Sequence, residues 1–249
     1  MVNGNISGYN IGMWNCRRGL IDGGKRASHK KVEVLDFLQK HKLHMLCLVE
    51  AGLHGEASRH RRVNPLATKD IHTILGIPGY KLLLPSSWQA HGQAKQLVIA
   101  REELHVQILD QGVQNSDLPT LTCEISLARE RKTVVNFFYR EFTGGVSGLA
   151  DMPAQVERLA RQAAHWQSLC AGSKDVICLG DANLCANRWN DENFAQKELA
   201  DLTHNFLLET SCCQLVKGFT RSEVGPHGEI SRSCTFTLMS LIRYMHQNL

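Results

Sequence analysis

The first 50 residues alternate between two apolar runs and one amphipathic segment. Residues 9–15, where Ile11 and Met13 alternate with smaller neighbours, predict a strand. Residues 45–49 are continuously apolar and short enough for a strand buried on both faces. Between them, Ser28 can cap a helix. One face of that helix is apolar and comprises Val34, Leu35 and Leu38. The order strand, helix, strand predicts a layered α/β fold.

The middle of the chain predicts one long loop and several strands. Residues 51–70 are polar, basic and contain histidines, so we expect a surface loop there. Short apolar stretches predict strands at residues 80–84, 96–100 and 106–109. The stretches 120–126 and 133–139 flank the polar residues 128–131 and predict a β-hairpin.

The second half predicts two helices around a buried strand. Pro153 lies near the start of the first helix, whose apolar stripe comprises Val156, Leu159, Ala163, Trp166 and Cys170. Residues 176–179 predict a buried strand that leads directly into Gly180-Asp181-Ala182-Asn183. The second helix carries Ala195, Leu199, Leu202 and Phe206 on one face, and residues 214–219 favour a further strand. Because no linker or repeat interrupts the chain, we expect one α/β (α+β) domain of two packed sheets with outer helices.

Composition narrows the class of protein. The chain has 249 residues, 43% of them hydrophobic and 21% charged, which is typical of a globular protein and excludes wholesale disorder. No apolar run approaches the roughly 18–20 residues of a membrane span. The first ten residues lack the basic head and apolar core of a secretory signal. We therefore expect a protein that is not secreted and has no membrane partner.

The nine cysteines predict buried thiols. Their number is odd, no Cys-x-x-Cys pair occurs, and no Cys/His grouping has the spacing of zinc ligands. Thiols of this kind suit a reducing, intracellular compartment.

Basic residues gather in two groups, although the net charge is only +4. The first group comprises Arg17, Arg18, Lys25, Arg26, Lys30 and Lys31, and the second comprises Arg59, Arg61 and Arg62. A nucleic-acid backbone would suit both groups. Solvated surface loops are the simpler explanation from charge alone, and both interpretations stay open.

Polar residues follow three of the predicted strands at the point where each strand ends. Asn15 ends the first strand, Glu50 ends the second, and Asp181 with Asn183 ends a third. Ligand sites of layered α/β folds gather at the carboxyl ends of strands. Carboxylate and amide oxygens at such an edge could hold Mg²⁺. Asparagine and aspartate are also common turn residues, which is the alternative explanation for each position taken alone.

Four segments in order resemble the successive motifs of the endonuclease/exonuclease/phosphatase superfamily. They are Gly12-Met13-Trp14-Asn15-Cys16-Arg17, Leu48-Val49-Glu50, Phe138-Tyr139-Arg140-Glu141 and Leu179-Gly180-Asp181-Ala182-Asn183, and Gly218-Phe219-Thr220-Arg221 extends the match. Asn187-Arg188-Trp189-Asn190 points to one branch, the apurinic-like endonuclease domain of non-LTR (LINE-type) retrotransposons. The resemblance covers residues 9–234, which leaves residues 1–8 as an N-terminal tail and residues 235–249 as an atypical C-terminal end.

The resemblance implies a two-layer β-sandwich flanked by helices that cleaves DNA phosphodiesters with Mg²⁺, or with Mn²⁺ as a substitute. Glu50 and Asn15 would hold the metal, Asp181 would orient or deprotonate water, and Tyr139 and Asn183 would position the phosphate. Nucleic acid would be bound by Arg17, Arg18, Arg140 and Thr220. No obligate protein partner is implied, and the nucleus is a candidate compartment.

The sequence departs from the family pattern near its end. The family supplies a late aspartate and a terminal Ser-Asp-His, whereas no aspartate occurs after Asp201 and neither His227 nor His246 follows one. We therefore expect the final strands to be missing or altered and the endonuclease to be impaired. Two alternatives stay open: a catalytically silent remnant that only binds nucleic acid or metal, and a phosphatase of the same superfamily.

Overall fold

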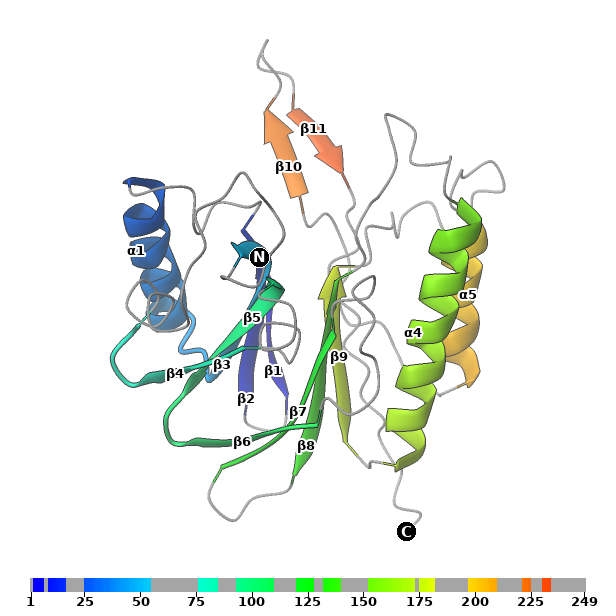
Figure 1. The fold of residues 1–249 in the computed structure, drawn as a ribbon, viewed down its shortest axis with the longest axis horizontal. Helices are drawn as coiled ribbons and strands as arrows, with labels where there is room; N and C mark the ends of the chain where they lie inside the picture. The colour runs from blue at the N-terminus through cyan, green and yellow to red at the C-terminus, as the bar shows by residue number, and fades with distance from the viewer. Residues whose placement is uncertain are drawn as a thin grey trace. The chain divides into compact units, whose positions relative to one another are not determined.

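A computed structural model gives the fold of the chain. It describes residues 2–6, 9–16, 25–54, 76–84, 93–109, 120–127, 132–139, 152–172, 175–181, 197–209, 221–224 and 230–233. The first elements are β1 (Val2–Ile6), β2 (Tyr9–Asn15), α1 (Lys25–Lys40), β3 (Met45–His54), β4 (Tyr80–Leu83), β5 (Gln93–Arg101) and β6 (Leu104–Ile108). They are followed by β7 (Thr120–Leu127), β8 (Thr133–Tyr139), α4 (Met152–Gly172), β9 (Val176–Asp181), α5 (Lys197–Glu209), β10 (Arg221–Val224) and β11 (Ile230–Ser233) (Figure 1).

The internal contacts of the chain divide it into two compact units. Unit 1 comprises residues 1–121 and 125–131, and unit 2 comprises residues 122–124 and 132–249. The described strands pair in the orders β1-β2-β3-β5-β4 and β6-β7-β8-β9, and β10 pairs with β11. The expected mixed α/β class, with helices and two larger sheets, is confirmed.

Unit 1 contains a strand–helix–strand unit built from β2, α1 and β3. The two strands run parallel, in register from Ile11 opposite Met45 to Asn15 opposite Val49. One face of α1 is buried against this sheet (Figure 1). The core there comprises Val34, Phe37 and Leu38 of the helix with Leu46, Leu48, Leu97 and Ile99 of the strands. The expected helix is therefore present.

The start of α1 and the end of β3 differ from the sequence expectation. Ser28 is not the N-cap, because α1 begins at Lys25 and the good helix formers Lys, Arg and Ala precede Ser28. The loop expected from residue 51 starts later, since β3 continues to His54. The register between β3 and β5 shifts between Val49 and Leu53, so the strand resumes pairing after an irregularity that a hydrophobic pattern does not reveal.

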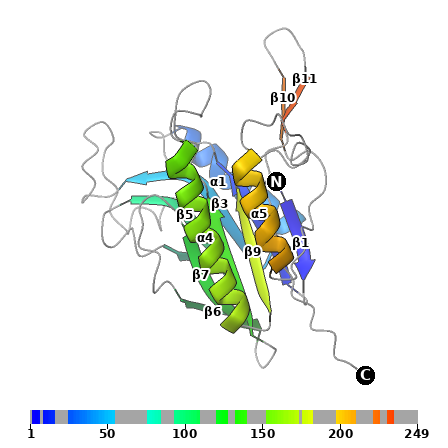
Figure 2. The same cartoon turned by 90° about the vertical axis from the view of Figure 1, so that its right-hand side faces the viewer.

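Unit 2 repeats the strand–helix–strand arrangement with β8, α4 and β9. The strands again run parallel, from Val134 opposite Val176 to Tyr139 opposite Asp181. All of β8 is buried. Figure 2 shows α4 and α5 lying side by side along this unit. Every residue of β8 and residues 176–180 of β9 are buried, which explains why both strands are nearly continuous apolar runs.

The buried face of α4 is more polar than the sequence suggested. Leu159, Trp166 and Cys170 are buried as expected, whereas Val156 and Ala163 are only half-buried. Gln155 and Gln162 are buried in their place. On α5, Leu199 and Phe206 are buried and Leu202 is half-buried. Polar residues enter the α4 stripe because the strands below offer hydrogen-bond partners to at least one of them, as shown below for Gln162.

Strands that the sequence did not predict lie near both ends of the chain. Val2–Ile6 form β1, an antiparallel neighbour of β2 that was not predicted as a strand. The antiparallel pair of β10 and β11 was not predicted either, and residues 214–219 lie outside the described part.

Among the described residues no helix is long and apolar enough to cross a bilayer. The described cysteines are buried and form no disulfide: Cys16, Cys47, Cys123, Cys170 and Cys178.

Candidate functional site

The carboxyl end of β2 brings Asn15 beside Glu50, which does not end β3 as expected but lies within it, where the parallel pairing with β2 stops and the register with β5 shifts. Asn15 pairs in register with Val49, and the backbone N–H of Cys16 donates to the carbonyl of Val49 at 2.8 Å. Glu50 follows Val49 directly, so the two candidate metal ligands lie on adjacent parallel strands. Asn15 is half-buried. The structure therefore places together the two residues that the sequence analysis assigned to the metal.

Unit 2 brings Tyr139 and Asp181 together in the same way. They are direct register partners at the carboxyl ends of β8 and β9. The Tyr139 side chain is 7% exposed. Parallel strands end at a common edge, so both candidate catalytic residues occupy the position where α/β folds place ligands.

The other candidate residues lie outside the described part of the chain. They are Asn183, Arg17, Arg18, Arg140 and Thr220. Asn183 follows β9 by two residues, and Arg140 follows β8 directly. Their roles stay predictions.

The donor set of unit 1 is chemically suited to a hard divalent cation. Asn15 contributes an amide oxygen and Glu50 a carboxylate, and Mg²⁺ is commonly held by one or two such oxygens with several retained waters. In the part of the chain that the structure describes, no group of three or more His, Cys, Asp and Glu side chains gathers as a metal cluster.

Gly180, one residue before Asp181, is required by the packing of β8. A Cβ atom at this position would lie 2.2 Å from Cδ1 and Cε1 of the Phe138 ring. Phe138 is also the register partner of Gly180. Only a hydrogen atom at residue 180 leaves room for the ring, so the glycine of the Gly180-Asp181 step has a steric function.

We expect Gly180→Ala to lower the free energy of unfolding by about 1–3 kcal/mol, the usual cost of overpacking. Because the new methyl group would clash with the Phe138 ring, adding Phe138→Leu to the Gly180→Ala variant should recover part of that loss. Urea unfolding of both single variants and the double variant measures the coupling. Simple additivity of the two losses would contradict the steric explanation.

A buried polar network lies beneath the strand that carries Tyr139. Trp166 Nε1 donates to Asn136 Oδ1 at 3.0 Å, and Gln162 Nε2 donates to the same oxygen at 3.4 Å. Asn136 Nδ2 donates to Thr122 Oγ1 at 2.8 Å, and this hydroxyl lies 3.3 Å from His165 Nε2. Because an indole N–H can only donate, Trp166 fixes which end of the Asn136 amide is the oxygen. The network joins β7, β8 and α4.

Sequence reasoning missed this network. Its signals were an asparagine in the middle of the apolar run of β8 and a glutamine within one turn of Trp166 on the helix stripe. Each is a polar residue at a position where its element faces the core, and such residues are buried only with partners.

We expect His165 to make stability pH-dependent, because burial lowers its pKa below the ordinary value of 6.5. The unfolded chain takes up a proton near 6.5 while the folded ring stays neutral. The stabilising contribution is therefore complete above that pH and is lost as the pH falls through the folded pKa. Thermal melts at about pH 7.5 and 5 should show a larger loss for the wild type than for His165→Gln. Equal losses would contradict this role.

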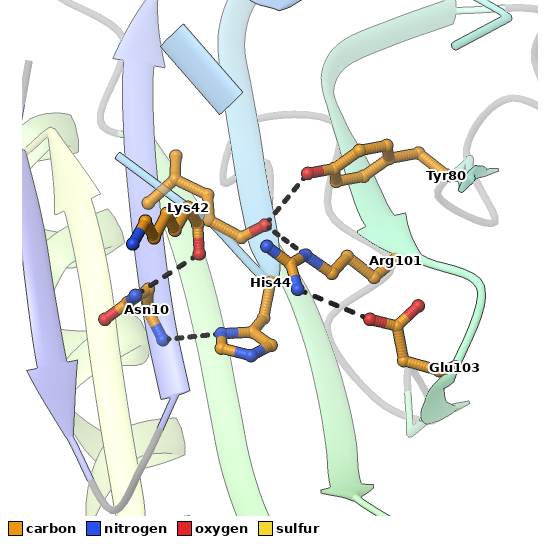
Figure 3. Close-up of polar contacts among 7 residues, drawn as sticks. Asn10, Lys42, His44, Tyr80, Arg101 and Glu103 are labelled. Carbon is orange, nitrogen blue, oxygen red and sulfur yellow. Dashed lines mark hydrogen bonds and ion pairs between the residues drawn. The ribbon is translucent and has the colours of Figure 1, made fainter. Parts of the chain in front are cut away.

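A second polar cluster lies at the opposite end of β3, where the strand begins. Tyr80 Oη and Arg101 Nε both donate to the carbonyl of Leu43, at 3.1 and 3.0 Å (Figure 3). The backbone N–H of Asn10 donates to His44 Nδ1 at 3.0 Å, so that nitrogen is the acceptor of the imidazole.

This cluster braces the turn between α1 and β3. The side chain of Asn10 donates to the carbonyl of Lys42 at 3.2 Å (Figure 3), and Lys42 has a φ of 49°. These bonds stabilise a left-handed backbone conformation that lysine rarely adopts. Because the cluster satisfies backbone groups at the amino ends of strands, it is structural and does not belong to the candidate site.

One solved structure supports the fold, and others are similar to the chain at lower TM-scores. The beta toxin of Staphylococcus aureus, solved as a β-hairpin deletion mutant, is 10% identical with a TM-score of 0.52, covering 87% of this chain and 77% of that chain. An endonuclease/exonuclease/phosphatase family protein from Leptotrichia buccalis is 12% identical with a TM-score of 0.43, covering 93% of this chain and 86% of that chain. Truncated Caenorhabditis elegans TDP2 is 12% identical with a TM-score of 0.41, covering 65% of this chain and 58% of that chain. The match to another TDP2 structure from the same organism covers 47% of the TDP2 chain, so this protein corresponds to less than two thirds of the length of either TDP2 structure.

The sequence itself gives the family. A comparison with curated proteins found no significant match. The profile of the Endonuclease/Exonuclease/phosphatase family, in contrast, matches residues 14–237, which include Asn15, Glu50, Tyr139 and Asp181. Because this match spans most of the chain and the fold agrees, the protein is a member of the Endonuclease/Exonuclease/phosphatase family.

Proposed function

We propose that this protein is a divalent-metal-dependent DNA endonuclease of the non-LTR retrotransposon type. The observation that carries the proposal is that chemistry-bearing residues lie side by side where the parallel pairing of two strands stops in each unit. In unit 1, Asn15 lies opposite Val49, the residue before Glu50, and the next residue, Cys16, donates its backbone N–H to the Val49 carbonyl. In unit 2, Tyr139 is the register partner of Asp181. Members of this family are nucleases and phosphatases that generally use divalent metal ions.

The residues suit hydrolysis of a phosphodiester. Asp181 is assigned as the base that orients and deprotonates the attacking water. Tyr139 and Asn183 are assigned as donors to the phosphoryl oxygens, where negative charge develops. Tyr139 and Asp181 are register partners at the edge where β8 and β9 end.

Glu50 and Asn15 would hold the metal ion, Mg²⁺ or Mn²⁺ in its place. When bound, such an ion supplies charge neutralisation at the leaving oxygen. Arg17, Arg18, Arg140 and Thr220 are assigned to the DNA backbone, and the three arginines follow strand ends closely in sequence. This placement favours a polyanionic substrate over a small phosphate ester, and an intracellular, nuclear location would give access to it.

The activity of this chain is expected to be weak. Residues 202–249 contain no aspartate, and the late histidines follow none. Loss of a positioned acid/base or charge-stabilising group commonly lowers the rate by about 10²–10⁴-fold. The proposal is therefore an impaired endonuclease, in contrast to a remnant with no activity.

The test is nicking of supercoiled plasmid by the full chain with Mg²⁺, with Mn²⁺ and with EDTA. We expect slow, metal-dependent conversion to the open circle, and little release of phosphate from small phosphate monoesters. Conversion that persists in EDTA would contradict the metal dependence. No conversion with either metal, together with retained DNA binding, would favour the silent remnant, and rapid release from monoesters would favour a phosphatase.

We expect Glu50→Gln to weaken Mn²⁺ binding by at least about tenfold, because the variant keeps the size of the side chain but removes the charge of the principal hard ligand. Titration of free Mn²⁺ by electron paramagnetic resonance measures the dissociation constant without any need for activity. Glu124→Gln, half-buried on β7, is the matched control and should bind as the wild type does. Identical Mn²⁺ binding by all three proteins would remove Glu50 from the metal site.

A further inference from the structure

We propose that Phe138 and Trp166 are positioning residues that fix the strand ends carrying Tyr139 and Asp181. The catalytic meaning of this inference rests on the proposed function, whereas its structural content does not. The two residues form a lock: the ring of Phe138 lies over Gly180, and Trp166 holds the ring there. Both side chains are buried, so the effect of the lock is exerted through the residues that follow Phe138 and Gly180.

The lock starts where β8 and β9 meet at Phe138 and Gly180. These residues are register partners, and a Cβ atom at residue 180 would lie 2.2 Å from the ring. The ring therefore occupies the space that a side chain on β9 would take. The next residues along the two strands are Tyr139 and Asp181, again register partners. The contact is one residue away from both candidate catalytic groups.

Trp166 closes the lock from α4. Its ring packs edge-on against Phe138 with centroids 4.6 Å apart and an interplanar angle of 61°. On its other side it contacts Phe206 of α5, with centroids 5.0 Å apart. Trp166 is fully buried, and Phe138 is 2% exposed. Neither ring has room to move without opening the core of unit 2.

Asn136 fixes the position of Trp166. The indole N–H donates to Asn136 Oδ1 at 3.0 Å, and the amide nitrogen donates to Thr122 Oγ1 at 2.8 Å. One buried amide thus ties α4 to both β7 and β8. If α4 slid or rotated, these bonds would break in a buried environment, where unpaired polar groups are costly.

The consequence for Tyr139 follows from strand geometry. Successive side chains of a strand point to opposite faces, so Phe138 faces α4 and Tyr139 faces away from it. A rotation of the strand at Phe138 therefore swings Tyr139 in the opposite direction. Misplacement of a reacting group by about 1 Å can lower a rate by about 10²-fold. The lock is a device that prevents this displacement.

The test replaces tyrosine by 3-fluorotyrosine and follows the ¹⁹F spectrum of the full chain. There are four tyrosines, and Tyr139→Phe assigns one resonance to Tyr139. Phe138→Leu removes the ring over Gly180, and Trp166→Phe keeps an aromatic ring but removes the indole N–H. We expect both variants to shift or broaden the Tyr139 resonance and to leave those of Tyr9 and Tyr80, in unit 1, unchanged.

Leu159→Ala is the matched control. Leu159 is buried on the same helix, two turns before Trp166, and has no part in the network. It should lower the melting temperature at least as much as Trp166→Phe does but leave the Tyr139 resonance in place. An equal effect of Leu159→Ala on Tyr139, or no effect of Phe138→Leu, would overturn the proposal.

Nicking kinetics separate this inference from the proposed function. If the wild type nicks DNA, Phe138→Leu and Trp166→Phe should lower kcat by about 10–100-fold with little change in KM, because only the orientation of reacting groups is altered. A selective change in KM would contradict a positioning role. If the wild type does not nick DNA, the proposed function fails, and the ¹⁹F result still decides whether the lock positions Tyr139.

Discussion

Trp166→Ala is expected to destabilise the protein by about 3–5 kcal/mol, the range for removal of a fully buried tryptophan. The side chain is 0% exposed and contacts Phe138 and Phe206. Its removal creates a cavity between β8 and α5 and deprives Asn136 Oδ1 of its closest donor. For a chain of this size, the melting temperature should fall by roughly 6–20 °C.

Ser168→Ala, two residues further along α4, is the control for this prediction. Ser168 is exposed, so its free energy of unfolding should change by less than about 0.5 kcal/mol. Trp166→Phe should lie between the two, since it retains ring contacts and leaves the oxygen of Asn136 with Gln162 alone. Calorimetry on the three variants gives the order. A loss for Trp166→Ala as small as that for Ser168→Ala would contradict the placement of Trp166 in the core.

The sequence predicted most of the strands because their burial is uniform. β8 was predicted with its observed bounds, since every residue from Thr133 to Tyr139 is buried and the run is continuously apolar or β-branched apart from Asn136. The extension of β3 to His54 could not be predicted, because it depends on pairing with Gln93 and Ala94 across a register shift. Distant pairing partners, and not local hydrophobicity, determine such strand ends.

The helix faces were predicted less well, for a related reason. On α4 the expected stripe included Val156 and Ala163, whereas Gln155 and Gln162 are buried in their place. Neighbouring helix residues point about 100° apart, so a shift of one residue changes which side chains meet the sheet. Gln162 is accepted there because Asn136 offers it an oxygen, and that partner lies on a strand 26 residues earlier.

The candidate site was predicted from strand ends, and the structure adds the register. That Asn15 lies beside Val49 and Tyr139 beside Asp181 follows from two parallel pairs, each connected through a helix. A sequence can indicate that a polar residue ends a strand, but it cannot indicate which strand is the neighbour. The registers make Asn15 with Glu50, and Tyr139 with Asp181, the residue pairs to be tested together.

The largest functional effect is expected from Asp181→Asn, which should lower the nicking rate by about 10²–10⁴-fold, the usual contribution of a positioned general base. Asparagine has nearly the same size and can hydrogen-bond a water, but it cannot accept the proton that water loses. Folding should be unaffected, because Gly180 and the register of β9 are unchanged. Plasmid nicking with Mn²⁺ and a parallel melting curve measure the two properties.

Asp201→Asn provides the matched control, since Asp201 is an exposed residue of α5 that forms an ion pair with Lys197. It should nick as the wild type does. Tyr139→Phe removes the hydroxyl that we propose donates to the phosphoryl oxygens and should lower the rate by about 10²–10³-fold, as loss of one such donor does elsewhere. If both residues act on the same transition state, the double variant should be little worse than Asp181→Asn, because groups that act as a unit are not additive. Undiminished nicking by Asp181→Asn would remove the end of β9 from the reaction and leave Glu50 as the carboxylate to examine.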